Sequence, residues 1–85
     1  MAGSPDLFNH LLGVNMEIAT KLPASEVEKI LAVVRSRTDE EIVSVWDGEF
    51  GPEVRTNRGH ISGHVWQVRR APSGWKILQG AEWVV

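Results

Sequence analysis

Basic side chains are concentrated in the C-terminal part of this 85-residue chain. Residues 54–85 hold five Lys or Arg and one Glu, whereas residues 1–53 hold four Lys or Arg and ten Asp or Glu. Guanidinium groups bind phosphate and can bond bidentately to guanine edges. The uneven distribution predicts a polyanion-binding face on a chain of net charge −2, unless it reflects only uneven solvated surfaces.

His60 and His64 are the two residues whose spacing could bind a metal. On a helix their i, i+4 positions bring both imidazoles to one side, whereas on a strand they would lie roughly 13 Å apart. The run between them contains no Glu, so the H-E-x-x-H motif is not met, and a third ligand would have to come from His10 or a carboxylate. We expect no metal site, with one histidine facing a groove and the other partly buried.

Sequence motifs for catalysis or cofactor binding are missing. There is no nucleophile elbow, P-loop or dinucleotide fingerprint, and the carboxylates cluster at helix-capping positions. The lack of cysteine excludes disulfides, thiol chemistry and cysteine-ligated zinc, and it permits a reducing compartment. The first residues lack the basic start of a secretory signal, and no apolar run approaches the roughly 18 residues of a membrane span. We therefore expect a non-catalytic, cytoplasmic protein without a cofactor.

The length of the chain predicts one small domain. Within residues 25–36, a capping box formed by Ser25 and Glu28 accompanies apolar residues at i, i+3, i+4 and i+7, which indicates an amphipathic helix. Residues 6–22 fit a helical stripe, although residues 14–18 could equally form a short strand.

The next segments give mixed signals. A second capping box, Thr38 with Glu41, favours another helix, although residues 42–46 have the composition of a strand. Residues 75–79 and 82–85 are interpreted as a hairpin. Residues 54–70 are ambiguous, because they place an apolar stripe on a helix but contain Gly59 and Gly63, which weaken one.

The order helix, helix, glycine-proline turn, basic segment and terminal hairpin is that of a winged helix-turn-helix. Residues 22–85 resemble the DNA-binding output domain of OmpR/PhoB-type response regulators. The resemblance rests on residues 22–27, on residues 40–46 with their Val-Trp ending, on residues 49–56 with their Arg-Thr, on His60-Ile61, and on residues 80–83. It implies a mainly α fold with a small β wing: a three-helix core and a C-terminal β-hairpin over residues 23–85, an extra element at 1–22, and a helix at 54–70.

In this resemblance, helix 54–70 enters the major groove of double-stranded DNA and the hairpin touches the backbone. Arg55 and Thr56 would bind phosphate, Arg58 and His60 would read base edges, and Ser62 is a weaker candidate. The flanking backbone would be held by Arg69, Arg70 and Lys76, with Gln79 reaching from the wing. The alternative for each arginine is a solvated face. Ser62 and Gly63 stand where the family carries basic residues, and the family's receiver domain is absent.

Trp66 would point outward on such a helix, beside Gly59 and Gly63. We expect its indole to pack beneath the wing with Trp75 or Trp83; the alternative is a protein contact, since two small residues four apart permit close helix approach.

The sequence thus predicts a small transcriptional regulator that binds duplex DNA and forms a dimer through residues 6–22. The alternative is a winged helix used for protein–protein interaction, as an adaptor or inhibitor. A third interpretation takes residues 41–47, 54–69 and 75–84 as strands of a small α+β sheet that binds a hydrophobic ligand.

Overall fold

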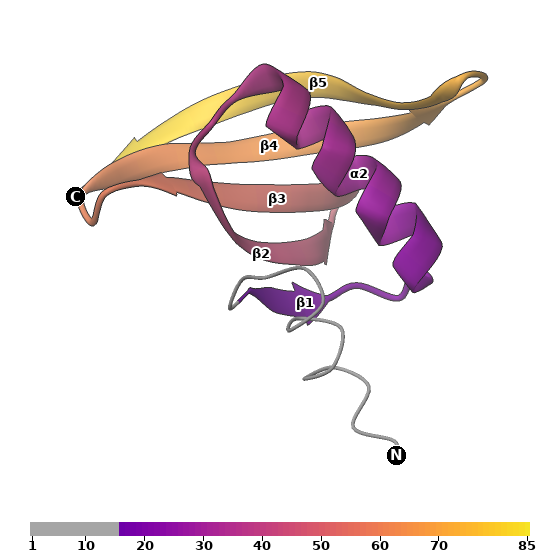
Figure 1. The fold of residues 1–85 in the computed structure, drawn as a ribbon, viewed down its shortest axis with the longest axis horizontal. Coiled ribbons are helices and arrows are strands. Elements are labelled where there is room, and N and C mark those ends of the chain that lie inside the picture. The colour runs from indigo at the N-terminus through magenta and orange to yellow at the C-terminus, as the bar shows by residue number, and fades with distance from the viewer. Residues whose placement is uncertain (1–15) are drawn as a thin grey trace, which may run out of the picture.

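The computed structural model of the protein describes residues 16–85. Along this part of the chain it has one helix and five strands: β1 (Glu17–Ala19), α2 (Ala24–Arg37), β2 (Glu41–Gly48), β3 (Gly51–Arg58), β4 (Ser62–Ala71) and β5 (Gly74–Val84). The strands form a single sheet in the order β1-β2-β3-β4-β5, and α2 crosses one face of it (Figure 1). β1 runs parallel to β2, and the other neighbours are antiparallel.

α2 forms where the apolar spacing predicts a helix. Its four apolar residues at i, i+3, i+4 and i+7 are all buried: Val27, Ile30, Leu31 and Val34. The expected capping box does not form, because the helix begins one residue before Ser25. Instead, the carbonyl oxygen of Pro23 accepts from the N–H groups of Glu26 and Val27 at 3.0 and 3.1 Å, which closes the first turn of the helix.

Thr38 ends α2 rather than starting a second helix. Its backbone is extended, its N–H donates to the carbonyl oxygen of Val34, and its Oγ1 accepts from the N–H of Glu40 at 3.1 Å. This side-chain turn redirects the chain into β2, where β-branched residues and Trp46 fit a half-buried strand. The helix expected after Thr38 is therefore wrong, and the strand composition of residues 42–46 was the better signal.

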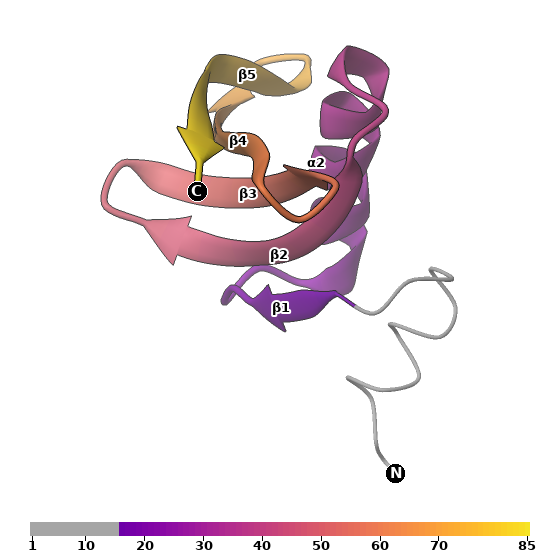
Figure 2. The same cartoon turned by 90° about the vertical axis from the view of Figure 1, so that its left-hand side faces the viewer.

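Alternation along β3 and β4 divides the sheet into an inner face, covered by α2, and an outer face. Val54 and Thr56 are fully buried on the inner face, while Arg55 between them is exposed on the outer one. On β4, Trp66 and Val68 are buried beneath the helix. Figure 2 shows α2 on one side of the twisted sheet, and no described element covers the other side.

Polar contacts fix the start of α2 and the segment that precedes it. Near the start of α2, Trp75 Nε1 donates to Glu26 Oε1 at 3.0 Å, and Arg70 pairs with the same oxygen at 3.2 Å while its guanidinium lies 4.7 Å from the Trp75 ring. The hydrogen bond from Trp75, with help from Lys29, lowers the pKa of Glu26. Asp47 at the end of β2 accepts from the Lys21 backbone at 3.0 Å and from the Thr20 hydroxyl, and the Thr20 bond lowers its pKa.

The winged helix-turn-helix and the resemblance on which it rests are wrong. Residues 54–70 form parts of β3 and β4, joined by a turn in which Gly59 has a φ of +71°. The described chain contains one helix, so it has no helix-turn-helix, and β5 is one long strand paired with β4 rather than a hairpin of its own. The observed sheet, covered by a single helix, is closer to the third interpretation of the sequence. That interpretation took residues 54–69 as one strand, whereas they form parts of β3 and β4.

Residues 1–15 lie outside the described part, so most of the expected N-terminal element at 6–22 does too. Within the described part of that element, Glu17–Ala19 form β1, a short edge strand. Within residues 16–85, no helix is long and apolar enough to cross a membrane.

Candidate functional site

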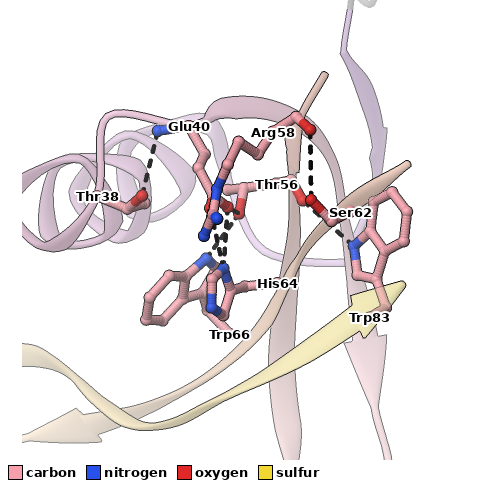
Figure 3. A network of polar contacts seen from close by, with 8 residues as sticks. All are labelled: Thr38, Glu40, Thr56, Arg58, Ser62, His64, Trp66 and Trp83. Atoms are coloured by element: carbon pink, nitrogen blue, oxygen red, sulfur yellow. Dashed lines mark hydrogen bonds and ion pairs between the residues drawn. The ribbon is translucent and has the colours of Figure 1, made fainter. Parts of the chain in front are cut away.

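The carboxylate of Glu40 is the meeting point of three polar side chains. Glu40 lies between α2 and β2, one residue before Glu41 pairs with Asn57 on β3. This register brings it over Thr56, which in turn pairs with His64 on β4. Both side chains face inward, toward the carboxylate (Figure 3).

Hydrogen bonds saturate this carboxylate. Thr56 Oγ1 donates to Glu40 Oε1 at 2.7 Å, and Arg58 contacts Oε2 with Nε at 3.2 Å and with a terminal guanidinium nitrogen at 3.1 Å. His64 Nδ1 lies 3.0 and 3.1 Å from the two oxygens. We name Glu40, Thr56, Arg58, His64 and Trp66 the Glu40 cluster.

The Glu40 side chain is 6% exposed, so its charge depends on these partners. Burial alone would raise the pKa of Glu40, but hydrogen bonds from Thr56, His64 and Arg58 outweigh burial and hold this pKa below its ordinary value. Glu40 is therefore ionised at neutral pH and accepts from each donor.

A second layer orients the donors. Trp66 is 6% exposed, and its Nε1 donates to Thr56 Oγ1 at 2.9 Å, which leaves the hydroxyl proton of Thr56 for Glu40. The His64 ring lies against the Trp66 indole, with centroids 5.0 Å apart. The bonds thus converge on the carboxylate: one path runs from the Trp66 indole through the Thr56 hydroxyl to Glu40, and the His64 imidazole donates to Glu40 from the other side.

The two nitrogens of His64 have different environments. In the neutral ring, Nδ1 donates to the carboxylate of Glu40, so Nε2 carries the lone pair. Nε2 has no hydrogen-bond partner within residues 16–85, yet the buried side-chain polar atom left unpaired there is Asn57 Oδ1 alone. Nε2 is consequently reachable from solvent, on a side chain that is 21% exposed.

A hollow of about 570 Å³ opens beside this imidazole, between the C-terminal end of α2 and the ends of β2, β3 and β4. Its walls include Arg37 and Thr38 from the helix end, Asn57 from β3, and Trp66 as the largest apolar surface. The hollow is large enough for a small molecule.

The nine residues expected to contact DNA do not share one surface. Thr56 is fully buried, Arg58 holds Glu40, and Arg70 holds Glu26, so these three have structural partners. His60 and Ser62 lie at the β3–β4 turn, where Ser62 Oγ donates to the Arg58 carbonyl at 3.5 Å. The remaining four lie on the outer face: Arg55, Arg69, Lys76 and Gln79.

The residues weighed for protein contact are also separated. Trp66 is buried, so the outward position expected on a helix is wrong, and it packs against Gly80 and His64 rather than against Trp75 or Trp83. Gly63 is buried beneath the Trp83 ring, whereas Gly59 is exposed in its turn. Within residues 16–85, no three metal-ligating side chains cluster, and His60 is not part of the Glu40 cluster.

Sequence reasoning missed Glu40 and the role of His64. Glu40 is one of three consecutive acidic residues, which were interpreted as capping groups. Its partners are 16 and 24 residues away and converge only in the β3–β4 register. The available signal was a two-residue period, which puts Thr56 on the same face as Val54. It brings His64 to that face only if residues 54–58 and 62–71 are both strands and pair in the observed register.

Comparison of the chain with protein-family models, with curated proteins and with solved structures finds no match.

Proposed function

We propose that the hollow beside His64 binds a small polar molecule and that His64 Nε2 exchanges a proton with it. The observation that carries this proposal is the asymmetry of the imidazole: Nδ1 is held by a buried carboxylate at 3.0 Å, while Nε2 is reachable from solvent on a residue that lines the hollow. A carboxylate–imidazole pair of this kind fixes the tautomer and stabilises the imidazolium that forms when Nε2 takes a proton.

Each partner has a definite task in this proposal. Glu40 stays ionised because three donors lower its pKa, so it attracts the positive charge that develops on His64. Thr56 and Arg58 hold the carboxylate in place, and Trp66 fixes the plane of the imidazole. These are positioning residues, and His64 is the group that would touch the substrate.

The walls restrict the kind of molecule. Cationic, anionic and apolar side chains all line the hollow, so a strongly charged ligand is not favoured. A neutral compound with a weakly acidic O–H or C–H fits best, because its proton can go to Nε2.

Hydrolysis of p-nitrophenyl acetate provides a generic probe of the reactive nitrogen. We expect the wild type to exceed the rate of free imidazole at equal concentration, and we expect His64→Gln to abolish the excess. Glu40→Gln should lower the rate because it removes the charge that stabilises the imidazolium. His60→Gln is the matched control, since His60 is an exposed histidine outside the cluster. Equal rates for wild type and His64→Gln would contradict the proposal.

DNA binding through a different surface remains a prediction. The major-groove helix is wrong, but duplex DNA could still contact the outer-face residues Arg55 and Lys76, and a transcriptional role or a protein partner stays a prediction. Titration of labelled duplex at two salt concentrations, with wild type and with Arg55→Ala/Lys76→Ala, tests it: binding should weaken steeply with salt and with the double substitution. A cytoplasmic location also stays a prediction. The proposed proton transfer by His64 replaces the expectation that the protein is non-catalytic.

A further inference from the structure

Two cationic side chains lie directly opposite each other on the outer face of the sheet. Arg69 on β4 is in register with Lys76 on β5, and both side chains are exposed. The next residues along each strand point toward α2, since Arg70 and Trp75 both bond to Glu26, and this alternation places Arg69 and Lys76 on the outer face. Like charges directly opposite on one face repel. The pair therefore destabilises the β4–β5 hairpin unless an anion neutralises it.

No carboxylate within residues 16–85 neutralises this pair. The ion pairs there involve other cations. Glu53 lies on the same face, in register with Gln67, but its carboxylate is directed over Gly48, where a Cβ would overlap it. It also accepts from Gln67 Nε2 at 3.5 Å. Arg69 and Lys76 thus present positive charge to solvent with no counter-ion from the described part of the chain.

A hollow of about 510 Å³ adjoins the two cations. Its lining residues are Phe50, Gln67, Arg69 and Leu78, so no acidic side chain of the described chain lines it. Phe50, in the β2–β3 turn, is 74% exposed, and Leu78 is 44% exposed because it is the bulged residue of β5. The hollow therefore combines apolar surface with a guanidinium at one side.

We propose that this hollow binds a small amphipathic monocarboxylate, a molecule that joins one carboxylate to a short apolar chain or ring. The planar guanidinium of Arg69 can bond to both oxygens of a carboxylate, and Lys76 adds a second positive charge beside it. Phe50 and Leu78 would cover the apolar group. The volume is that of a small-molecule site, and the apolar lining of only two side chains favours a free acid over a protein partner.

This site is separate from the hollow beside His64 and does not depend on the proposed proton transfer. His64 bonds to Glu40 on the inner face, whereas Arg69 and Gln67 lie on the outer face. The two hollows share no lining residue. A ligand of either one can therefore be recognised by the signals that it shifts.

Titration with 3-phenylpropanoate, followed in ¹H–¹⁵N amide spectra of the full chain, tests the proposal. The signals of Phe50, Gln67, Arg69 and Leu78 should shift saturably, with a dissociation constant on the order of 1 mM. 3-Phenylpropan-1-ol lacks the charge and acetate lacks the ring, so each should bind at least about tenfold more weakly. Equal binding of the alcohol, or shifts confined to the residues around His64, would overturn the proposal.

Substitutions at the two walls test the assigned contacts. Arg69→Gln should weaken binding of 3-phenylpropanoate by about tenfold, and Phe50→Ser should also weaken it. The matched control is Arg35→Gln, which removes an exposed arginine of α2 that forms no ion pair within residues 16–85, and it should keep the wild-type affinity. An Arg69→Gln variant that binds as tightly as the wild type would overturn the proposal.

Thermal unfolding without ligand separates a binding role of Arg69 from a structural one. Arg69→Gln should melt at or above the wild-type temperature, because it relieves the repulsion with Lys76. A lower melting temperature would contradict the unneutralised pair on which the proposal rests.

Discussion

Thr56 and His64 lie directly opposite each other on β3 and β4, and both direct a hydrogen atom at the carboxylate of Glu40. The cross-strand register therefore does two things at once. It holds the carboxylate at the end of α2, and it leaves one nitrogen of His64 reachable from solvent on a residue that lines the hollow. Stability and the proposed chemistry consequently share the same three side chains.

Lowering the pH should destabilise the protein through Glu40. Its folded pKa lies below the ordinary value of 4.5, so its contribution to stability is complete above that value and is lost as pH falls through the folded pKa. Urea unfolding of wild type and Glu40→Gln as a function of pH checks this. The two stability curves should differ at pH 7 and converge in acid; a constant difference at all pH values would contradict the linkage.

Thr56→Val should destabilise the protein by about 1–3 kcal/mol, because it leaves the Trp66 N–H without an acceptor and removes a donor from Glu40. Thr56→Ser keeps the hydroxyl group and should recover most of the loss. Thermal or chemical denaturation measures both values. If valine were as stable as serine at this position, the hydrogen-bond chain through Thr56 would have no energetic role.

Gly63→Ala should be severely destabilising, by more than about 3 kcal/mol, because the new Cβ would overlap the Thr56 backbone oxygen and the Trp83 ring. The comparison is Gly59→Asn, at a turn position with φ of +71° and no atom within 4 Å of a Cβ. Asparagine adopts this conformation readily, so the protein should tolerate it. Similar losses from both substitutions would show that close packing at Gly63 is not the cause.

Trp66 emission should report on occupation of the hollow. The buried indole contacts His64 and lines the cavity, so a bound molecule should change its fluorescence, with Trp46, Trp75 and Trp83 replaced by Phe to isolate the signal. Screening neutral hydroxy and keto compounds against this triple variant and against its His64→Gln derivative measures the effect. A ligand of the proposed site should lose affinity in the derivative, and unchanged affinity would place the binding elsewhere.

The sequence predicted α2 well because a helix is a local structure. Val27, Ile30, Leu31 and Val34 repeat within one segment, and their burial needs no knowledge of the partner. The strand composition of residues 42–46 was visible as well, but a misleading capping box at Thr38 competed with it. In the structure the Thr38 hydroxyl serves the turn before β2.

Residues 54–85 could not be assigned in the same way. A bulge at Leu78 interrupts the two-residue alternation of β5, as one at Val43 does in β2, so the inner face changes parity along these two strands. Gly80 was interpreted as a hairpin turn, whereas it lies within β5 beneath the Trp66 ring. The Glu40 cluster joins residues 40, 56, 58, 64 and 66, and no local period brings these together.

The central claim is that His64 presents a free Nε2 to the hollow, and long-range ¹H–¹⁵N correlation spectra of the imidazole test it most directly. At a pH where the ring is neutral, we predict the Nδ1–H tautomer in the wild type and a mixture of tautomers in Glu40→Gln. A wild-type ring protonated on Nε2 instead would contradict the account, since no lone pair would then face the hollow.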